Sequence, residues 1–369
     1  MKKLGFGCMR FPLLDPEDPT SVDIPQVCGM VDRFLERGFT YFDTAYFYHK
    51  GTSENIVKQV LVDRHPRDSF TLADKLPLTS LKDKTEEDQE RIFDEQLKKC
   101  GVDHFDYYLL HNVNVGTYQT AQRLDSFSFA LRKKAEGKIR HLGFSFHDTA
   151  AMLDRVLTEH PQVEFVQLQL NYLDWEDPAV QSRLCYETAV RHGKKVVVME
   201  PVKGGKLANP PQPVVDLLRD HDPAPSMPSW AIRFAASLDN VMVVLSGMSD
   251  LEQLTDNTNY MADFVPLNGQ EQELMAQAAD LIRGDGTIPC TACSYCTDGC
   301  PSHIPIPSIF ALYNSSIRAP EQEDYRSAFR ALEVKPEACL YCGQCMGACP
   351  QHIDVIGGLK TAAAVLGES

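Results

Sequence analysis

The sequence predicts an α/β protein in two parts: a (β/α)8 TIM barrel and a small, mainly helical C-terminal domain. From residue 3 to about residue 262, short β-branched or aromatic segments alternate with amphipathic segments, the pattern of parallel strands joined by helices. Eight such units suit a closed barrel better than an open sheet. The first unit also lacks a dinucleotide-binding turn, because GFGCMR carries the bulky Arg10 where helix packing requires glycine.

The predicted strands are short apolar runs, and most of them end in a polar residue. They are Leu4–Met9, Thr40–Thr44, Ser69–Lys75, Phe105–His111, Arg140–Phe146, Glu164–Asn171, Lys194–Glu200 and Asn240–Ser246. Because the carboxyl ends of parallel barrel strands meet at one rim, their terminal polar residues are the first candidates for an active site.

A helix is predicted after each strand. The segment from Asp23 to Gly38 begins with a capping carboxylate, and the segment from Thr85 to Cys100 is followed by Gly101, a common helix stop. These helices form the outer ring that a barrel requires.

The composition changes where the barrel pattern ends. A helix predicted at Gln270–Arg283 leads into the loop GDGTIP, which suits a linker. Beyond it, two cysteine runs are separated by short helical segments, Ser308–Tyr313 and Tyr325–Leu332. We therefore expect a barrel at residues 1–265 and, at 266–369, a linker helix followed by the cysteine-rich domain.

The overall charge excludes several classes of partner. Lys and Arg number 36 against 51 Asp and Glu, which gives a net charge of −15 and a surface that repels nucleic acid and anionic lipid. No apolar run is long enough to span a membrane, and the first residues do not resemble a signal peptide. We expect a cytoplasmic protein, in which 12 cysteines indicate metal ligands rather than a disulfide framework.

Each cysteine run has the spacing C-x2-C-x2-C-x3-C-P of the two-cluster bacterial ferredoxins. The candidate metal ligands are Cys290, Cys293, Cys296 and Cys300 in the first run and Cys339, Cys342, Cys345 and Cys349 in the second. Three thiolates two residues apart suit one [4Fe-4S] cubane, and the fourth lies too far along its turn to join them. Cys300 is therefore expected to complete the cluster of the second run, and Cys349 that of the first.

Zinc is the alternative metal, but its structural sites favour separated C-x2-C pairs. The 38 residues between the runs are partly helical and longer than a compact β-ferredoxin needs, so we favour a helical ferredoxin-like module. Cys28, Cys100 and Cys185 are expected to be plain reduced thiols. Cys8, near the end of the first strand, is a candidate for lining a pocket.

Four polar side chains at successive strand ends form a candidate catalytic site: Asp43, Tyr48, Lys75 and His111. The Lys75 ammonium is expected to lower the pKa of Tyr48 from about 10, so that the phenol acts as a general acid. Asp43 is expected to hold Lys75, and a neutral His111 to position a carbonyl oxygen. Each residue also has a simpler alternative role. Taken alone, Asp43 fits a helix cap and Tyr48 a rim aromatic. Lys75 fits a solvated strand end, and His111 fits a core histidine. Together, in barrel order, they indicate a proton-donating site for a carbonyl.

These residues lie in motifs that resemble the aldo/keto reductase family. The motifs are FDTAYFY with Asp43 and Tyr48, LADK with Lys75, LLHN with His111, GFSFH with Ser145, and VQLQLN with Gln167 and Asn171. The resemblance spans about residues 3 to 262 in the family's order. More narrowly, the chain resembles the bacterial branch in which the reductase barrel is fused to a C-terminal ferredoxin-like domain with two [4Fe-4S] clusters.

The resemblance implies hydride transfer from a nicotinamide cofactor, NAD(P)(H), lying extended across the barrel mouth. It implies that Ser145 and Gln167 hold the carboxamide and that the loop Pro201–Leu207 passes the diphosphate. The full set of implied cofactor contacts is Ser145, Gln167, Asn171, Met199, Pro201, Gly204, Gly205, Leu207, Ser246, Gly247, Met248, Gln253 and Asn257. The last five would surround the adenosine end.

Several positions depart from the family pattern. Met199 replaces the aromatic that usually stacks on the nicotinamide, and Phe146, followed by His147, replaces the usual Asn. Gly247 and Gln253 stand where cations usually clamp the 2'-phosphate of NADP. Without a charge-assisted partner there, we expect weak discrimination between NADH and NADPH, or a preference for NADH.

Three functions remain open. The first is an oxidoreductase that reduces a small carbonyl or oxidises the matching alcohol, with the ferredoxin-like domain in the place of the family's C-terminal substrate loop. The second is a flavin-dependent electron-transfer enzyme with an external electron carrier, because a hydride carries two electrons and each cubane accepts one. The third is a nicotinamide-sensing module with structural clusters, which turnover of simple aldehydes would exclude.

Overall fold

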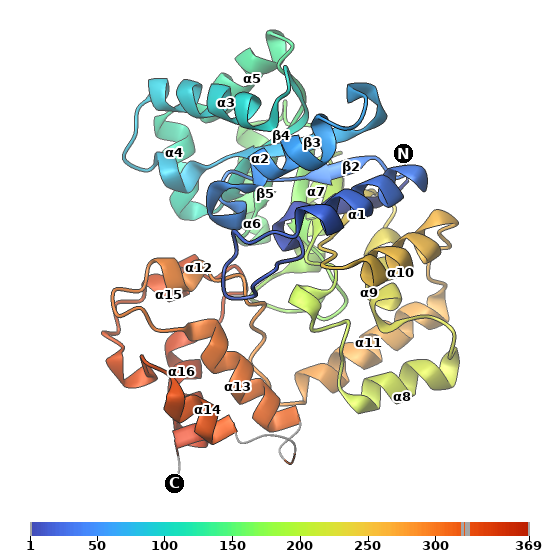
Figure 1. The fold of residues 1–369 in the computed structure, drawn as a ribbon, viewed down its shortest axis with the longest axis vertical. Coiled ribbons are helices and arrows are strands. Elements are labelled where there is room, and N and C mark those ends of the chain that lie inside the picture. Colours follow the sequence, from blue (N-terminus) through green and yellow to red (C-terminus); the bar gives the residue numbers. More distant parts are fainter. Residues whose placement is uncertain (1, 319–320, 322–324, 368–369) are drawn as a thin grey trace.

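The computed structural model describes residues 2–318, 321 and 325–367, and it confirms the predicted closed barrel (Figure 1). The strands are β1 (Leu4–Gly7), β2 (Tyr41–Asp43), β3 (Thr71–Leu76), β4 (Phe105–Val113), β5 (Ile139–Phe146), β6 (Phe165–Gln169), β7 (Lys195–Met199) and β8 (Val241–Ser246). Each strand pairs in parallel with the next, and β8 closes the barrel by pairing with β1, where Gly5 lies opposite Leu245.

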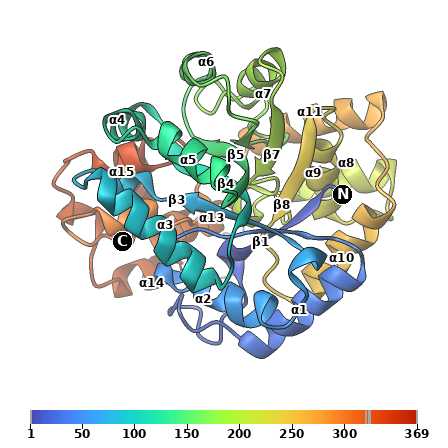
Figure 2. The ribbon, with the colours of Figure 1, turned by 90° about the horizontal axis from the view of Figure 1, so that it is seen from above.

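Helices surround the barrel in the outer ring that Figure 2 shows. They are α1 (Ile24–Glu36), α2 (Ser53–Val57), α3 (Glu86–Cys100), α4 (Val115–Arg123), α5 (Ser126–Ala135), α6 (Ala150–Glu159), α7 (Ser182–Arg191), α8 (Gln212–His221), α9 (Met227–Ala236) and α10 (Leu251–Ala262). The Asp23 side chain accepts a hydrogen bond from the backbone N–H of Gln26 and so begins α1. Gly101, in the left-handed region at φ 71°, ends α3 as predicted.

Large side chains fill the barrel interior, and two glycines make room for them. The buried interior residues are Tyr41, Ala73, Leu109, Phe165, Val197, Val243 and Leu245. A Cβ atom at Gly143 would lie 2.5 Å from a ring carbon of Phe165, and one at Gly5 would lie 2.7 Å from Val243. The interior is therefore a packed core, so the polar side chains at the rim are the candidates for chemistry.

The rim departs from regular strand geometry. β1 stops at Gly7 rather than at Met9, because a short 3-10 turn at Cys8–Arg10 follows it. β4 runs two residues beyond the predicted end, with an irregularity in its register on β5 between Leu110 and Val113. Asn112, inside that irregularity, has φ 59°, a conformation that non-glycine residues rarely adopt.

The helix that follows the barrel pattern packs on the barrel. Met275 and Ile282 of α11 (Gly269–Arg283) are buried in a cluster with Trp230 of α9 and Leu207 of the loop after β7. This packing places α11 with the barrel domain, so we propose that the domain border lies in the loop after Arg283 rather than at residue 265.

The C-terminal domain is mainly helical, as predicted, and lies at one end of the barrel (Figure 1). Its helices are α12 (Tyr295–Asp298), α13 (Ile306–Arg318), α14 (Tyr325–Ala331), α15 (Gln344–Ala348) and α16 (Val355–Gly367). They bury a separate small core that includes Ile309, Phe310, Phe329 and Leu359. Among the described residues, no helix combines the length and the apolar character that crossing a membrane requires.

Candidate active site at the barrel rim

A buried ion pair lies at the centre of the rim. The Lys75 ammonium, at the end of β3, lies 2.5 Å from Asp43 Oδ1 at the end of β2. It also donates to the backbone oxygen of Thr44 at 2.7 Å. Both charged side chains are 2% exposed or less. Because a buried charge is stable only when it is paired and hydrogen-bonded, Asp43 holds Lys75 in one position.

A strained turn brings Tyr48 to this ion pair. His49 and Lys50, next in the chain, both have positive φ angles near 50°, and His49 is tied by its ring nitrogens to the backbone oxygens of Pro19 and Cys8. The Tyr48 hydroxyl then lies 3.4 Å from Lys75 Nζ. Strain of this kind is typical of functional sites, where the surrounding structure holds it.

The expected lowering of the pKa of Tyr48 is wrong for this structure. Burial, followed by the negative charge of Asp43, holds the pKa of Tyr48 well above its usual value. Asp43 accompanies Lys75, so the carboxylate offsets the effect of the ammonium on the phenol. Tyr48 is therefore fully protonated at neutral pH, which leaves it a proton donor but not an activated one.

His111 completes the group from β4. Its ring lies edge-on to that of Tyr48, with the ring centroids 6.2 Å apart. Burial, and then the charge of Lys75, hold the pKa of His111 well below its usual value, so the imidazole is neutral. Its Nδ1 atom is buried and has no hydrogen-bond partner. A neutral imidazole next to a phenol can donate to, or accept from, an oxygen atom placed between them.

Buried polar side chains behind Lys75 hold its backbone. Asp74 accepts a hydrogen bond from Lys75 N at 2.8 Å, and Gln96 donates to Lys75 O at 3.0 Å. Gln96 also donates to Glu54, whose carboxyl, like that of Asp74, is completely buried. Burial raises the pKa of both acids. The sequence pattern did not single out this layer, because neither acid lies at a strand end.

Cys8 lies beneath the same site. It is completely buried, and burial followed by the charge of Asp43 raises the pKa of its thiol. The thiol is therefore unreactive and packs in the core rather than lining an open pocket. Cys100 and Cys185 are buried as well, whereas Cys28 is half-buried.

The residues expected at the nicotinamide carboxamide are neighbours at the rim. Ser145 and Gln167 lie opposite each other on β5 and β6. Gln167 Nε2 donates to Asp43 Oδ2 at 3.2 Å, and Ser145 Oγ accepts the backbone N–H of Asn112 at 2.7 Å. The structure therefore brings both amide-binding candidates to the candidate catalytic group, with part of their hydrogen-bonding capacity already used.

Asn171 and Met199 have different surroundings. Asn171 is completely buried and donates to Asp174 Oδ2 at 2.7 Å and to the backbone oxygen of Glu200 at 3.1 Å. It therefore supports the loops after β6 and β7. Met199, at the end of β7, is half-buried.

The residues expected at the adenosine end lie around the end of β8. Ser246 and Asn257 are hydrogen-bonded to each other, and Met248 is buried. Gln253 is exposed and bonds Asp250 at the start of α10. The alkyl part of the Arg10 side chain packs against Gly247, where a Cβ atom would lie 2.8 Å from Arg10 Cγ, while its guanidinium donates to the backbone oxygen of Thr291. Arg10 was not among the sequence candidates for cofactor binding.

The loop after β7 contacts the C-terminal domain. Thr291 lies against Gly204, and Arg10 Nη2 donates to the Thr291 backbone oxygen at 2.8 Å. Lys203 Nζ donates to Gln351 Oε1 at 2.6 Å. The C-terminal domain therefore covers the barrel mouth. It stands in the place of the family's C-terminal substrate loop, which was expected to be missing from this chain. Nothing in the spacing of Thr291 or Gln351 indicates this contact.

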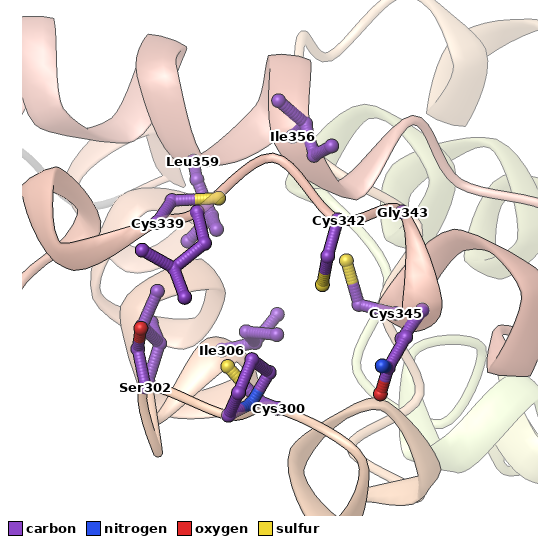
Figure 3. Close-up of a pocket in the computed structure, with 13 residues that line it drawn as sticks. Cys300, Ser302, Ile306, Cys339, Cys342, Gly343, Cys345, Ile356 and Leu359 are labelled. Atoms are coloured by element: carbon purple, nitrogen blue, oxygen red, sulfur yellow. The ribbon is translucent and has the colours of Figure 1, made fainter.

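The cysteines form two groups. Figure 3 shows the sulfurs of Cys300, Cys339, Cys342 and Cys345 facing one cavity, which these four cysteines help to line. One cysteine comes from the first run and three come from the second, which is the arrangement that the spacing predicts. Among the described residues, no three His, Cys, Asp or Glu side chains lie close enough to share one metal ion. A cavity edged by separated thiols suits a cubane better than a zinc ion.

The second group lies at the barrel mouth. Burial raises the pKa of Cys296 to about 11, and the nearby charges of Cys290 and Cys349 add to the rise. Burial also raises the pKa of Cys290 and Cys293, and the carboxylate of Glu200 contributes in both cases. Cys349 of the second run is thus a neighbour of the first run, and this group adjoins the loop after β7.

The fold and the rim residues define a barrel oxidoreductase with an attached iron-sulfur domain. The aldo/keto reductase family profile matches residues 3–280, and the profile of the 4Fe-4S dicluster domain matches residues 289–353. Since the first match covers well over half of the chain, this protein belongs to the aldo/keto reductase family.

Solved structures with a similar fold include two aldo-keto reductases and a putative 2,5-diketo-D-gluconic acid reductase B. The holo form of one from Bacillus halodurans is 23% identical, with 75% of this chain and 91% of that chain covered and a TM-score of 0.57. One from Klebsiella pneumoniae in complex with NADPH is 19% identical, with 76% and 90% covered and a TM-score of 0.56. A putative 2,5-diketo-D-gluconic acid reductase B is 22% identical, with 75% and 87% covered and a TM-score of 0.58. At these identities the likeness shows the fold.

Proposed function

We propose that the barrel reduces a carbonyl to an alcohol, or catalyses the reverse oxidation, with Tyr48 as the general acid and a nicotinamide as the hydride source. The observation that carries the proposal is the position of the Lys75 ammonium between Asp43 Oδ1, at 2.5 Å, and the Tyr48 hydroxyl, at 3.4 Å. A structural ion pair has no need of a phenol beside it, whereas a proton donor needs a neighbouring charge that stabilises its anion.

In this reaction the chain's residues position an oxygen and supply a proton. The neutral His111 donates a hydrogen bond to the substrate oxygen, and Tyr48 gives it a proton. Lys75 stabilises the phenolate that remains, and Asp43 keeps Lys75 in place. In the oxidative direction the Tyr48 phenolate accepts the proton instead, so oxidation is favoured at high pH.

The reacting end of the site fits a nicotinamide. Ser145 and Gln167 lie together on the rim beside Asp43, where a carboxamide would find hydrogen-bond partners. When bound, a reduced nicotinamide supplies the hydride that adds to the carbonyl carbon. The complex with NADPH of the Klebsiella pneumoniae protein supports this cofactor class. Gln253 is uncharged, and the Arg10 guanidinium is engaged by Thr291, so we propose weak discrimination between NADH and NADPH.

The C-terminal domain is proposed to hold two [4Fe-4S] clusters. Cys300 with Cys339, Cys342 and Cys345 would hold the cluster far from the barrel, and Cys349 with Cys290, Cys293 and Cys296 the one at the barrel mouth. The chemistry that a cluster supplies is the gain or loss of one electron.

Turnover by the anaerobically purified, cluster-loaded protein tests the proposal. A panel of aldehydes and ketones with NADH or NADPH is expected to give nicotinamide oxidation that Tyr48→Phe abolishes. Absence of turnover with every carbonyl, and with the matching alcohols in reverse, would count against a reductase and favour a nicotinamide-sensing module.

A second candidate is an electron-transfer enzyme that passes single electrons between the barrel and an external carrier. The observation that favours it is the order of the two cysteine groups. One adjoins Glu200 at the barrel mouth, and the other includes the exposed Cys342. This route needs a cofactor that splits an electron pair, such as a flavin. The comparisons lend no support to a flavin, and an inventory of bound cofactors in the purified protein decides the question.

A further inference from the structure

We infer that the docked C-terminal domain and an extended dinucleotide exclude each other at the barrel mouth, so that the cofactor binds only when the domain moves off the loop after β7. The inference rests on the proposed function, since it concerns the path of the proposed cofactor. It follows from a mismatch between the two ends of the expected cofactor path. The reacting end of the site fits a nicotinamide, but the loop expected at the diphosphate is covered.

The closest contact is at Gly204. This residue has φ 63°, and a Cβ atom built on it would lie 2.7 Å from both the Cβ atom and the backbone oxygen of Thr291. A glycine in this conformation suits a close approach of phosphate oxygens. Here the approach is made by Thr291 instead, and the remaining space does not admit even a methyl group. A diphosphate and Thr291 cannot both occupy this position.

The two lysines of the loop are also engaged. Lys203 is 2% exposed, and its ammonium lies 2.6 Å from both Asp174 Oδ1 and Gln351 Oε1. Lys206 Nζ donates to Thr287 Oγ1 at 2.6 Å. Both cations nearest the expected diphosphate path therefore already have partners from residues 284 onward, and a phosphate would have to replace them.

Gln351 anchors the docked domain. It is 5% exposed, and besides the Lys203 contact its amide pairs with the amide of Gln169 and donates to Glu200 Oε2 at 2.8 Å. A buried amide with all its groups satisfied stabilises the docked position, and losing one partner leaves the others unpaired. Gln351 lies two residues after Cys349, so the anchor belongs to the segment that would hold the cluster at the barrel mouth.

The consequence is measurable as a loss of apparent affinity. If only the undocked protein binds the dinucleotide, the apparent dissociation constant equals the intrinsic one divided by the undocked fraction. Weakening the anchor raises that fraction and tightens binding, although Gln351 makes no contact with the cofactor. A residue that merely supported the fold would weaken binding or leave it unchanged.

The test compares Gln351→Ala with wild type and with Gln277→Ala, an exposed glutamine on α11. Calorimetric titration of the cluster-loaded protein with NADPH and with NADH is expected to show binding tighter by about tenfold for Gln351→Ala only. Hydrogen exchange of segment 288–295 in wild type is expected to rise when the dinucleotide is added, because the domain leaves the loop. This second measurement uses unaltered protein, so it decides the question even if Gln351→Ala folds poorly.

The outcomes separate the inference from the proposed function. Equal binding by all three proteins, with exchange at 288–295 unchanged by the dinucleotide, would overturn the exclusion and leave the nicotinamide proposal standing. A different outcome is that neither dinucleotide binds, while Gln351→Ala by itself increases the hydrogen exchange of segment 288–295. That result would overturn the nicotinamide proposal and the inference with it.

Discussion

The Lys75 ammonium lies at the centre of the proposed proton-donating site. It is 1% exposed and contacts a carboxylate at the end of β2 and a backbone oxygen and a phenol from the segment that follows β2. A buried ion pair of this kind contributes little net stability, but removing one partner leaves an uncompensated charge. The geometry therefore serves the position of Tyr48 more than the stability of the barrel.

Replacement of Tyr48 by Phe is expected to lower carbonyl reduction by about 10² to 10⁴-fold, because the proton donor is lost while the ring remains. Dinucleotide affinity is expected to stay nearly the same. Steady-state kinetics together with a binding titration measure both effects. Tyr46→Phe, on the same turn, is the control and should retain activity. Retention of most activity by Tyr48→Phe would transfer the role of the acid to His111.

Replacement of Lys75 by Met is expected to reduce the rate and to move the pH profile. The pKa of Tyr48 is already raised by burial, and loss of the ammonium at 3.4 Å raises it further. Carbonyl reduction needs the phenol, so its alkaline decline should shift to higher pH, and alcohol oxidation should need a higher pH as well. Rates measured above about pH 9 check this sign, because the pKa of Tyr48 already lies well above its usual value. Lys75→Arg, which keeps the charge, should shift the profile less, and a shift to lower pH would contradict the assignment.

At the scale of strands and helices, the barrel interior decides how much the rim residues can move. Phe165 of β6 and Tyr41 of β2 fill the interior, and the neighbouring strands leave room for them at Gly143 and Gly5. Close-packed interiors transmit strain, so a change in this layer would shift the strand ends that carry Ser145 and Gln167.

Gly143→Ala is expected to destabilise the protein by about 1 to 3 kcal/mol, because its Cβ atom would overlap the Phe165 ring. Gly29→Ala is the matched control, since Gly29 lies within α1 and a Cβ atom there meets nothing within 4 Å. That substitution should be neutral or stabilise by up to about 1 kcal/mol. Denaturant unfolding of both variants gives the comparison. The loss caused by Gly143→Ala should be smaller in a Phe165→Val background than in wild type, although the Phe165 backbone oxygen, 2.7 Å from the added Cβ atom, keeps part of it. An equal loss in both backgrounds would show that the Phe165 ring is not the cause.

At the scale of the whole molecule, two domains meet over the barrel mouth. The barrel supplies Glu200, Lys203 and Gly204, and the C-terminal domain supplies Thr291 and Gln351. The cysteine group of the first run lies at this contact, and the other group lies beyond it. The order from the rim outward is therefore the Tyr48 phenol, the inner cysteine group and the outer cysteine group. The inner group is Cys290, Cys293, Cys296 and Cys349, and the outer group is Cys300, Cys339, Cys342 and Cys345. The proposed electron transfer to an external carrier would use this order.

Protein purified without oxygen is expected to contain about eight irons and eight acid-labile sulfides per chain, from two cubanes with four thiolates each. Cys293→Ser should lose the inner cluster and Cys300→Ser the outer one, each with about four irons left and the barrel still folded. Cys28→Ser, which changes a cysteine outside both groups, should retain both clusters and about eight irons. Iron and sulfide assays with circular dichroism measure these outcomes, and about two zinc ions per chain with little iron would exclude a ferredoxin-like domain.

The barrel, the helical C-terminal domain, the four rim residues and the grouping of the cysteines were all predictable from the sequence, because each depends on a local pattern. Apolar periodicity gives the strands and helices, polar residues at strand ends give the rim, and the C-x2-C-x2-C-x3-C-P spacing separates the fourth cysteine from the first three. Only the tertiary structure decided the raised pKa of Tyr48, the position of Arg10 against Gly247, and the cover that Thr291 and Gln351 form over the loop after β7. These features depend on burial and on contacts between residues far apart in the chain, such as the 148 positions that separate Lys203 from Gln351. No local pattern records such distances, so their physical effects appear only when the chain is folded.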